Sequence, residues 1–241
     1  GLLVSANGAS ITGNSTVTGT LTVSSTLTAS SGFTVSAGAV SLPAGSLETA
    51  DYADTSVTDA KLALPGSMKL LQTVTASASA TVDLETGIDS TYDAYVIVIN
   101  SLIPASDDVA LNMRVKAAGS YQADAADYAW DNIIGTPATA LAGSTDVSDS
   151  EMTLTAVAGT LGIGNASGEN LNMEIRFSDP DAAKFHDFHW SGVYNRAADS
   201  LPARVTGGGC YNTVEAITGV RFLLSSGNIT SGTFSLYGLK K

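Results

Sequence analysis

The segment LNMEIRFS, residues 171–178, alternates strictly between apolar and polar side chains. Alternation with a period of two is typical of a β-strand that buries one face and exposes the other. The turn residues Asp179-Pro180-Asp181 come next, and a second long segment, KFHDFHWSGVYN, follows at 184–195. Both segments are therefore predicted to be β-strands, and they set the class of the C-terminal part of the chain.

Strand-like segments continue on both sides of this pair, from residue 69 to residue 239. No segment keeps an apolar period of 3.6 residues over three turns, and many short strands separated by turns favour an antiparallel sandwich. We therefore predict an all-β chain in which residues 67–241 form an antiparallel, jelly-roll-like β-sandwich head. The predicted strands are 69–75, 80–84, 94–100, 110–116, 151–156, 171–178, 184–195, 217–224 and 233–239. The predicted turns are 103–108, 142–144, 179–181, 207–209 and 225–228.

The N-terminal segment differs in composition, because the first charged residue of the chain is Glu48. Ser and Thr supply 17 of residues 1–43, with isolated apolar residues between them, as in TLTV at 20–23. In one copy these few apolar side chains cannot offset the backbone entropy lost on ordering. We therefore predict that residues 1–43 form an extended β shaft shared by three or more copies. A flexible Ser/Thr-rich tether is the alternative, but a tether gains nothing from period-two patterning.

Residues 44–63 contain a ten-residue repeat, AGSLETADYA followed by DTSVTDAKLA. Each copy places a serine before an apolar residue and Thr49 or Asp59 three positions after that serine, which resembles an N-cap and one short helical turn. Each copy has one apolar edge and no core, so it too needs neighbouring copies. Leu64-Pro65-Gly66 ends this neck, which we place at 44–66. The side chains predicted to face the shared axis are Leu21, Val23, Phe33, Val35, Leu47, Val57 and Leu62.

Charge and cysteine content limit the classes of partner. The net charge is −12 and no basic patch exists, so nucleic acid and anionic membranes are disfavoured. No apolar run is long enough to span a bilayer. The single cysteine, Cys210, excludes an intrachain disulfide framework and is interpreted as a small buried side chain. No cofactor is expected.

Two sets of side chains are candidates for metal binding. His186 and His189 are three apart on a predicted strand, so they point to opposite faces and cannot chelate one metal without a bulge. The alternative is a metal on an oligomer axis, held by one histidine from each chain. Acidic residues gather at 124–131 and at 146–151, but neither group has the spacing of a calcium loop. Solvated carboxylates are the preferred interpretation of both groups, and no metal site is predicted.

Aromatic residues are scarce, so their positions carry information. The segment YQADAADYAWDN, residues 121–132, brings Tyr121, Tyr128 and Trp130 together with Asp127 in what is predicted to be a long loop. Sugars stack their C–H faces on aromatic rings while their hydroxyls donate to carboxylates. These four residues are therefore the predicted ligand site. The alternative is that the rings cap the core of the sandwich.

The sequence resembles bacteriophage virion fibres in several places. LPAGSLETADYADTSVTDAKLA at 42–63 is similar to a decapeptide collar of tail-fibre and head-fibre proteins, and GNSTVTGTLTVSSTLT at 13–28 to their β-rich shafts. LLQTVTASASATVDLETGIDSTYDAYVIVIN at 70–100 and GTFSLYGLKK at 232–241 resemble the opening and last strands of fibre tips. The resemblance implies a homotrimer on the virion surface, held at its N-terminus by a capsid or tail protein, and transfers no catalytic residue.

The expected function is adhesion of the trimeric head to a host-surface glycan or receptor, without enzymatic activity. Head fibre, short tail fibre and fragment of a longer fibre remain open. So do a purely structural decoration fibre, a secreted bacterial adhesin, and a glycan-cleaving spike that uses acids such as Asp124 or Asp187.

Overall fold

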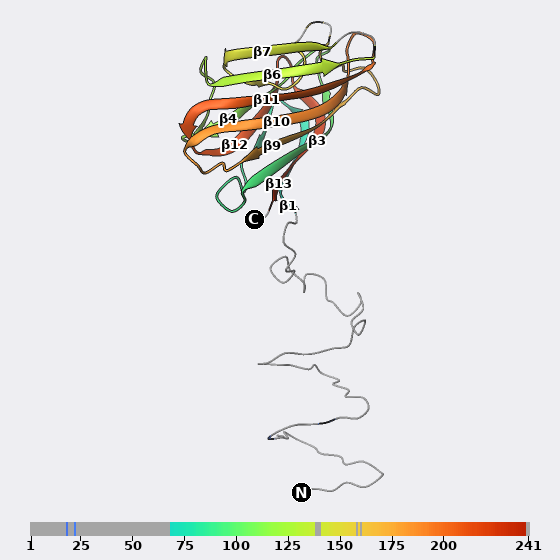
Figure 1. Ribbon diagram of the computed structural model, residues 1–241. Coiled ribbons are helices and arrows are strands. Elements are labelled where there is room, and N and C mark those ends of the chain that lie inside the picture. The colour runs from blue at the N-terminus through green and yellow to red at the C-terminus, as the bar shows by residue number, and fades with distance from the viewer. Residues whose placement is uncertain are drawn as a thin grey trace, which may run out of the picture. The chain divides into compact units, whose positions relative to one another are not determined.

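The computed structural model (Figure 1) describes Thr18, Thr22 and residues 68–137, 141–157, 159 and 161–239. Contacts divide the chain into two units, Gly1–Leu62 and Ala63–Lys241, and every described strand belongs to the second. The predicted shaft, neck and axis-facing side chains lie outside the described residues, apart from Thr18 and Thr22, for which no strand is assigned.

Two antiparallel sheets make up the head, and the described residues contain thirteen strands and no helix. The larger sheet has eight strands in the order β1 (Met68–Ser79), β13 (Ile229–Leu239), β3 (Ala94–Pro104), β9 (Leu171–Ser178), β10 (Lys184–Asn195), β11 (Pro202–Glu215), β6 (Tyr128–Gly135) and β7 (Ala142–Asp149). The smaller sheet has the order β2 (Thr81–Leu84), β12 (Ile217–Leu224), β4 (Leu111–Ala117) and β5 (Ser120–Tyr121), with β8 (Met152–Thr153) paired to β4. The predicted all-β class with antiparallel sheets is confirmed.

The alternation seen in the sequence determines which face of each strand is buried. In β9, Leu171, Met173, Ile175 and Phe177 are buried, and the polar residues between them are exposed. The ring of Phe177 stacks on Tyr95 of β3 at 5.1 Å between centroids and contacts Phe188 of β10 at 5.2 Å. Inward side chains of both sheets belong to one hydrophobic core, so the sheets form a two-layer sandwich.

Three of the predicted strands, 171–178, 184–195 and 217–224, have the bounds found in the structure for β9, β10 and β12. The predicted strand at 151–156 is shorter, because only Met152–Thr153 pairs with a neighbour. The predicted loop at 121–132 was wrong in its second half, which lies in β6, and the turns predicted at 142–144 and 207–209 lie inside β7 and β11.

The glycine run at 207–209 explains the last of these errors. A Cβ atom at Gly207 would lie 2.6 Å from Cζ2 of Trp190, and one at Gly209 would lie 2.7 Å from Sδ of Met152. Gly207 and Gly209 therefore allow close packing of neighbouring side chains within a strand. The local sequence alone favours a turn, because glycine runs are typical of turns.

Candidate functional site

Two of the predicted ligand-binding aromatics are core residues of β6. Tyr128 is completely buried; its hydroxyl accepts the Val115 N–H at 2.9 Å and donates to the Gln122 carbonyl at 3.1 Å. Trp130 is 6% exposed, and its indole N–H donates to Asp149 Oδ2 at 3.0 Å. These positions favour the alternative that the rings cap the core, because neither ring offers an exposed stacking face.

The other two predicted site residues lie elsewhere. Tyr121, in β5 of the smaller sheet, stacks on the Arg221 guanidinium at 3.8 Å, and its hydroxyl donates to Glu85 Oε1 at 2.7 Å. Burial first, and then this hydrogen bond, raise the pKa of Tyr121. Asp127 accepts the Asp124 N–H at 2.7 Å and thereby closes the turn before β6. The structure therefore does not bring the four residues into one site.

Of the other residues considered for metal binding, some are held by contacts within the head and others are exposed on its surface. Glu151 pairs with Arg114 at 2.9 Å on the smaller sheet. His186 is buried and its Nε2 donates to the Glu215 carbonyl at 2.6 Å, whereas His189 is exposed, so the predicted opposite orientation of the histidines is confirmed. In the part of the chain that the structure describes, no group of three or more His, Cys, Asp or Glu side chains is arranged to hold a metal ion.

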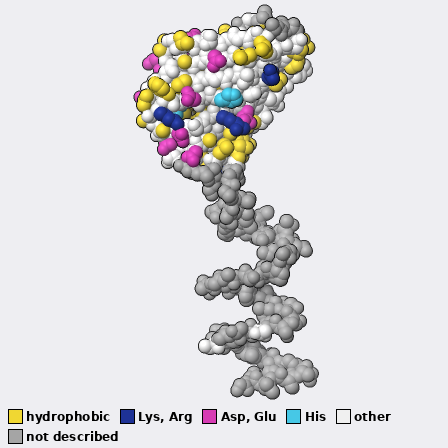
Figure 2. Space-filling view, in the orientation of Figure 1, with side chains coloured by type: hydrophobic (Ala, Val, Ile, Leu, Met, Phe, Trp, Pro, Cys, Tyr) yellow, Lys and Arg dark blue, Asp and Glu magenta, His cyan; other side chains and the backbone are white. Residues whose placement is uncertain are grey.

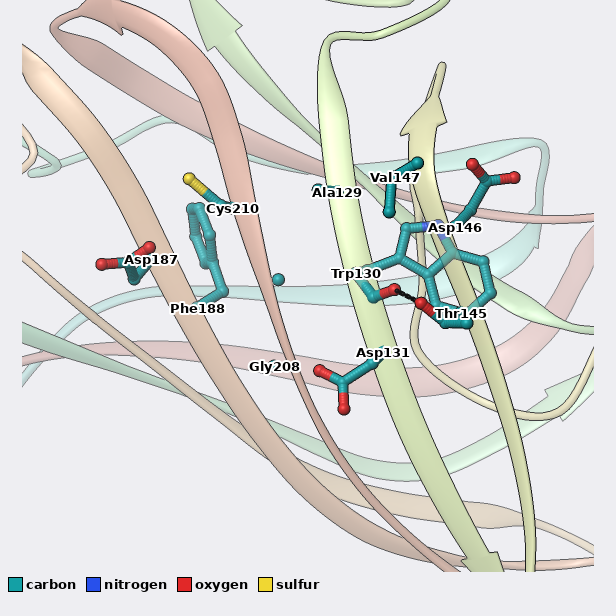
Figure 3. Close-up of a pocket in the computed structure, with 11 residues that line it drawn as sticks. Ala129, Trp130, Asp131, Thr145, Asp146, Val147, Asp187, Phe188, Gly208 and Cys210 are labelled. Carbon is teal, nitrogen blue, oxygen red and sulfur yellow. Dashed lines mark hydrogen bonds between the residues drawn. The ribbon is translucent and has the colours of Figure 1, made fainter.

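An open groove of about 420 Å³ lies on the outer face of the larger sheet, where β10, β11, β6 and β7 run side by side (Figures 1 and 3). Gly208 lies in its floor and is paired in register with Asp131 on one side and His189 on the other. The groove is lined by Ala129, Trp130, Asp131, Thr145, Asp146, Val147, Asp187, Phe188, Gly208, Gly209 and Cys210.

The groove exists because the outward positions near its centre carry small side chains or none. Gly208 has no side chain, and Ala129 and Cys210 are opposite each other in the β6–β11 register. The larger side chains of Asp131 and Asp187 stand on either side of this low strip, as Figure 3 shows. A Cβ atom at Gly208 would contact only the Phe188 carbonyl at 3.5 Å and Asp131 Oδ1 at 4.0 Å, so a larger side chain could project outward there.

The groove presents hydrogen-bond acceptors on a lining that otherwise consists mainly of small and apolar residues. Asp131, Asp146 and Asp187 present carboxylates that can accept from hydroxyl or amine donors. Thr145 is already engaged, because its hydroxyl donates to the Trp130 carbonyl at 3.1 Å. Burial, and then the hydrogen bond and charge of Asp187, raise the pKa of the Cys210 thiol to about 11. Cys210 is therefore protonated at neutral pH and is not an activated nucleophile.

Further hollows open on the same outer face. One of about 350 Å³ lies between β3, β9, β10 and β11, and one of about 430 Å³ lies between Leu141 and Pro202. Arg204 lines both of these hollows, and no carboxylate partner is found for it among the described residues. The outer face of the larger sheet is therefore the hollowed surface of the head.

The groove residues Asp187 and Gly208 are absent from the predicted ligand site. The sequence feature that could have identified Gly208 is the alternation of faces along a strand. Within the glycine run, it places Gly207 and Gly209 on one face and Gly208 on the other.

No protein-family model, curated protein or solved structure matches the chain. Among the described residues, no helix has the length and apolar character needed to cross a membrane.

Proposed function

We propose that this chain is a homotrimeric, non-enzymatic virion fibre whose C-terminal head adheres to a host-surface glycan. In this proposal, residues 1–43 are the shaft that a capsid or tail protein holds, residues 44–66 are the neck, and the head is a jelly-roll-like sandwich. The observation that carries the proposal is the ten-residue repeat at 44–63, whose sequence supplies apolar edges but no core of its own. It precedes a head, described from Met68 onward, that has its own hydrophobic core.

The acidic groove supports a polyhydroxylated, uncharged ligand. Sugar hydroxyls can donate to Asp131 and Asp187 while the sugar ring lies over the flat floor at Gly208. The net charge of −12 disfavours polyanions, so the ligand class is a neutral glycan or one bridged by a cation. Three weak sites on one fibre act together, and such avidity can exceed the affinity of a single site by roughly 10²–10⁴.

Filling the groove tests the adhesive part of the proposal. Gly208→Phe projects a ring outward over the floor, and we expect attachment to host cells or purified surface glycan to fall by about tenfold or more, equivalent to about 1.4 kcal/mol. Gly208→Ala is the matched control, because a single methyl group leaves most of the groove open. Tryptophan fluorescence establishes that both variants keep the native head.

Asp131→Asn and Asp187→Asn refine this test, because each replaces an acceptor-only carboxylate with an amide of the same shape. Attachment that is unchanged in Gly208→Phe would reject the groove as the binding site. A wild-type fibre that binds neither host cells nor glycans would instead favour a purely structural decoration fibre. The burial of Tyr128 and Trp130 also favours that function, because it removes two predicted ligand-binding rings from the surface.

A further inference from the structure

An exposed apolar patch lies where the head begins. Met68 and Leu70 of β1 are each 52% exposed, and their register partners on β13 are Leu239 and Tyr237, which are half-buried. We call these four residues the basal patch. Figure 2 shows hydrophobic side chains gathered on this part of the outer face, at the β1–β13 edge of the larger sheet.

A β-bulge fixes the outward direction of Leu70. The register between β1 and β13 shifts between Leu70 and Gln72, and Leu71, within the bulge, packs against the core. Leu70 is therefore directed to the outer face, opposite Tyr237, and cannot turn inward without breaking the register.

The outer face of the same pair of strands is polar farther from residue 68. Thr73 and Ser235 oppose each other there, with their hydroxyl oxygens 3.3 Å apart, and Thr75 opposes Thr233. On the outer face of this strand pair, the apolar character is thus confined to the end of β1 that follows the neck. Isolated exposed apolar residues are ordinary, but several adjacent exposed apolar residues mark a surface that another molecule buries.

We infer that the basal patch is the surface through which the heads of three copies contact one another around the fibre axis. This inference rests on the proposed function, because the predicted self-association of residues 1–66 is what brings the copies together. Residue 66 lies two positions before Met68 in every copy, so a shared neck brings the Met68 residues of the three chains together, and the basal patch is the described surface next to that point.

The charge pattern of the patch agrees with a contact between identical chains. Equivalent side chains approach one another around a threefold axis, so a charged residue there would face its own copies. None of the four patch residues is charged, and Lys69, which lies between two of them, pairs in register with Gly238 and points to the other side of the strand. The occupant of the patch is accordingly a second copy of this chain.

Cysteine cross-linking of the full chain tests the inference. Leu70→Cys is made in a Cys210→Ser background, so that the introduced thiol is the only one, and the protein is treated with a short bismaleimide. The matched control is Val147→Cys, at a position 80% exposed on β7, the opposite edge of the larger sheet. We expect covalent dimers from Leu70→Cys at about ten times the control yield or more, because thiols held at a contact react at a high effective concentration.

Sedimentation equilibrium on the same samples separates this inference from the proposed function. A trimer whose Leu70→Cys thiols cross-link no better than the Val147→Cys thiols overturns the basal contact and leaves the fibre proposal standing. A monomer contradicts the fibre proposal itself. Met68→Cys gives an independent second position, and strong cross-linking there together with Leu70→Cys confirms the contact.

Discussion

Gly207→Ala is expected to destabilise the head by about 3 kcal/mol, the upper part of the range for overpacked cores. The added methyl carbon would lie 2.6 Å from Cζ2 of Trp190 and 2.5 Å from the carbonyl oxygen of Asp131. The second of these contacts is with backbone that belongs to the β6–β11 ladder, so it cannot be relieved by a side-chain rotation. Relief requires either displacement of β6 or a tilt of the buried indole.

Urea denaturation followed by tryptophan fluorescence measures this loss. The chain has two tryptophans, Trp130 and Trp190, and both are buried in the head core, so the signal reports on the head and on no other part of the chain. Gly208→Ala is the control on the neighbouring residue, and its unfolding free energy should stay within about 0.5 kcal/mol of wild type. Equal destabilisation by both variants would mean that the glycine run is needed for backbone conformation and not for the packing of Trp190.

Trp190→Ala is expected to cost about 4 kcal/mol, within the range for deletion of a large aromatic side chain from a core. Trp190 is completely buried on β10, and no hydrogen-bond partner is found for its indole nitrogen among the described residues. The loss therefore comes from apolar burial and from the cavity left behind, with no hydrogen bond to lose.

Val193→Ala on the same strand provides the comparison, because Val193 faces outward and is 48% exposed. We expect it to change the unfolding free energy by no more than about 0.5 kcal/mol. The remaining tryptophan, Trp130, reports unfolding in both variants. A small effect of Trp190→Ala would show that the interior around β10 collapses to fill the space, and would contradict a tightly packed centre of the sandwich.

Strands with strong alternation could be predicted from the sequence, and strands without it could not. Residues 171–178 combine a period of two with large apolar side chains, so local pattern and final burial agree. β7 and the middle of β11 are rich in Gly, Ser, Thr and Asp, which locally favour turns. They are strands because their neighbours in the sheet pair with them, and that pairing is a tertiary effect that no short window of sequence contains.

The candidate site was harder to predict for a related reason. Its carboxylates come from Asp131, Asp146 and Asp187, on β6, β7 and β10. β7 pairs directly with β6, and β6 and β10 are neighbours only through the strand β11 between them. The ligand site predicted from the sequence instead consisted of residues that lie close together in the chain, at 121–130. In a β-strand, successive residues of that segment alternate between core and surface, so Tyr128 and Trp130 turn inward.

Sedimentation equilibrium of the full chain tests whether the N-terminal segment is completed by copies of itself. We expect a single species with three times the chain mass of 24.4 kDa, whose mass does not fall on dilution through the micromolar range. A species of 24.4 kDa with an ordered N-terminal segment would contradict it.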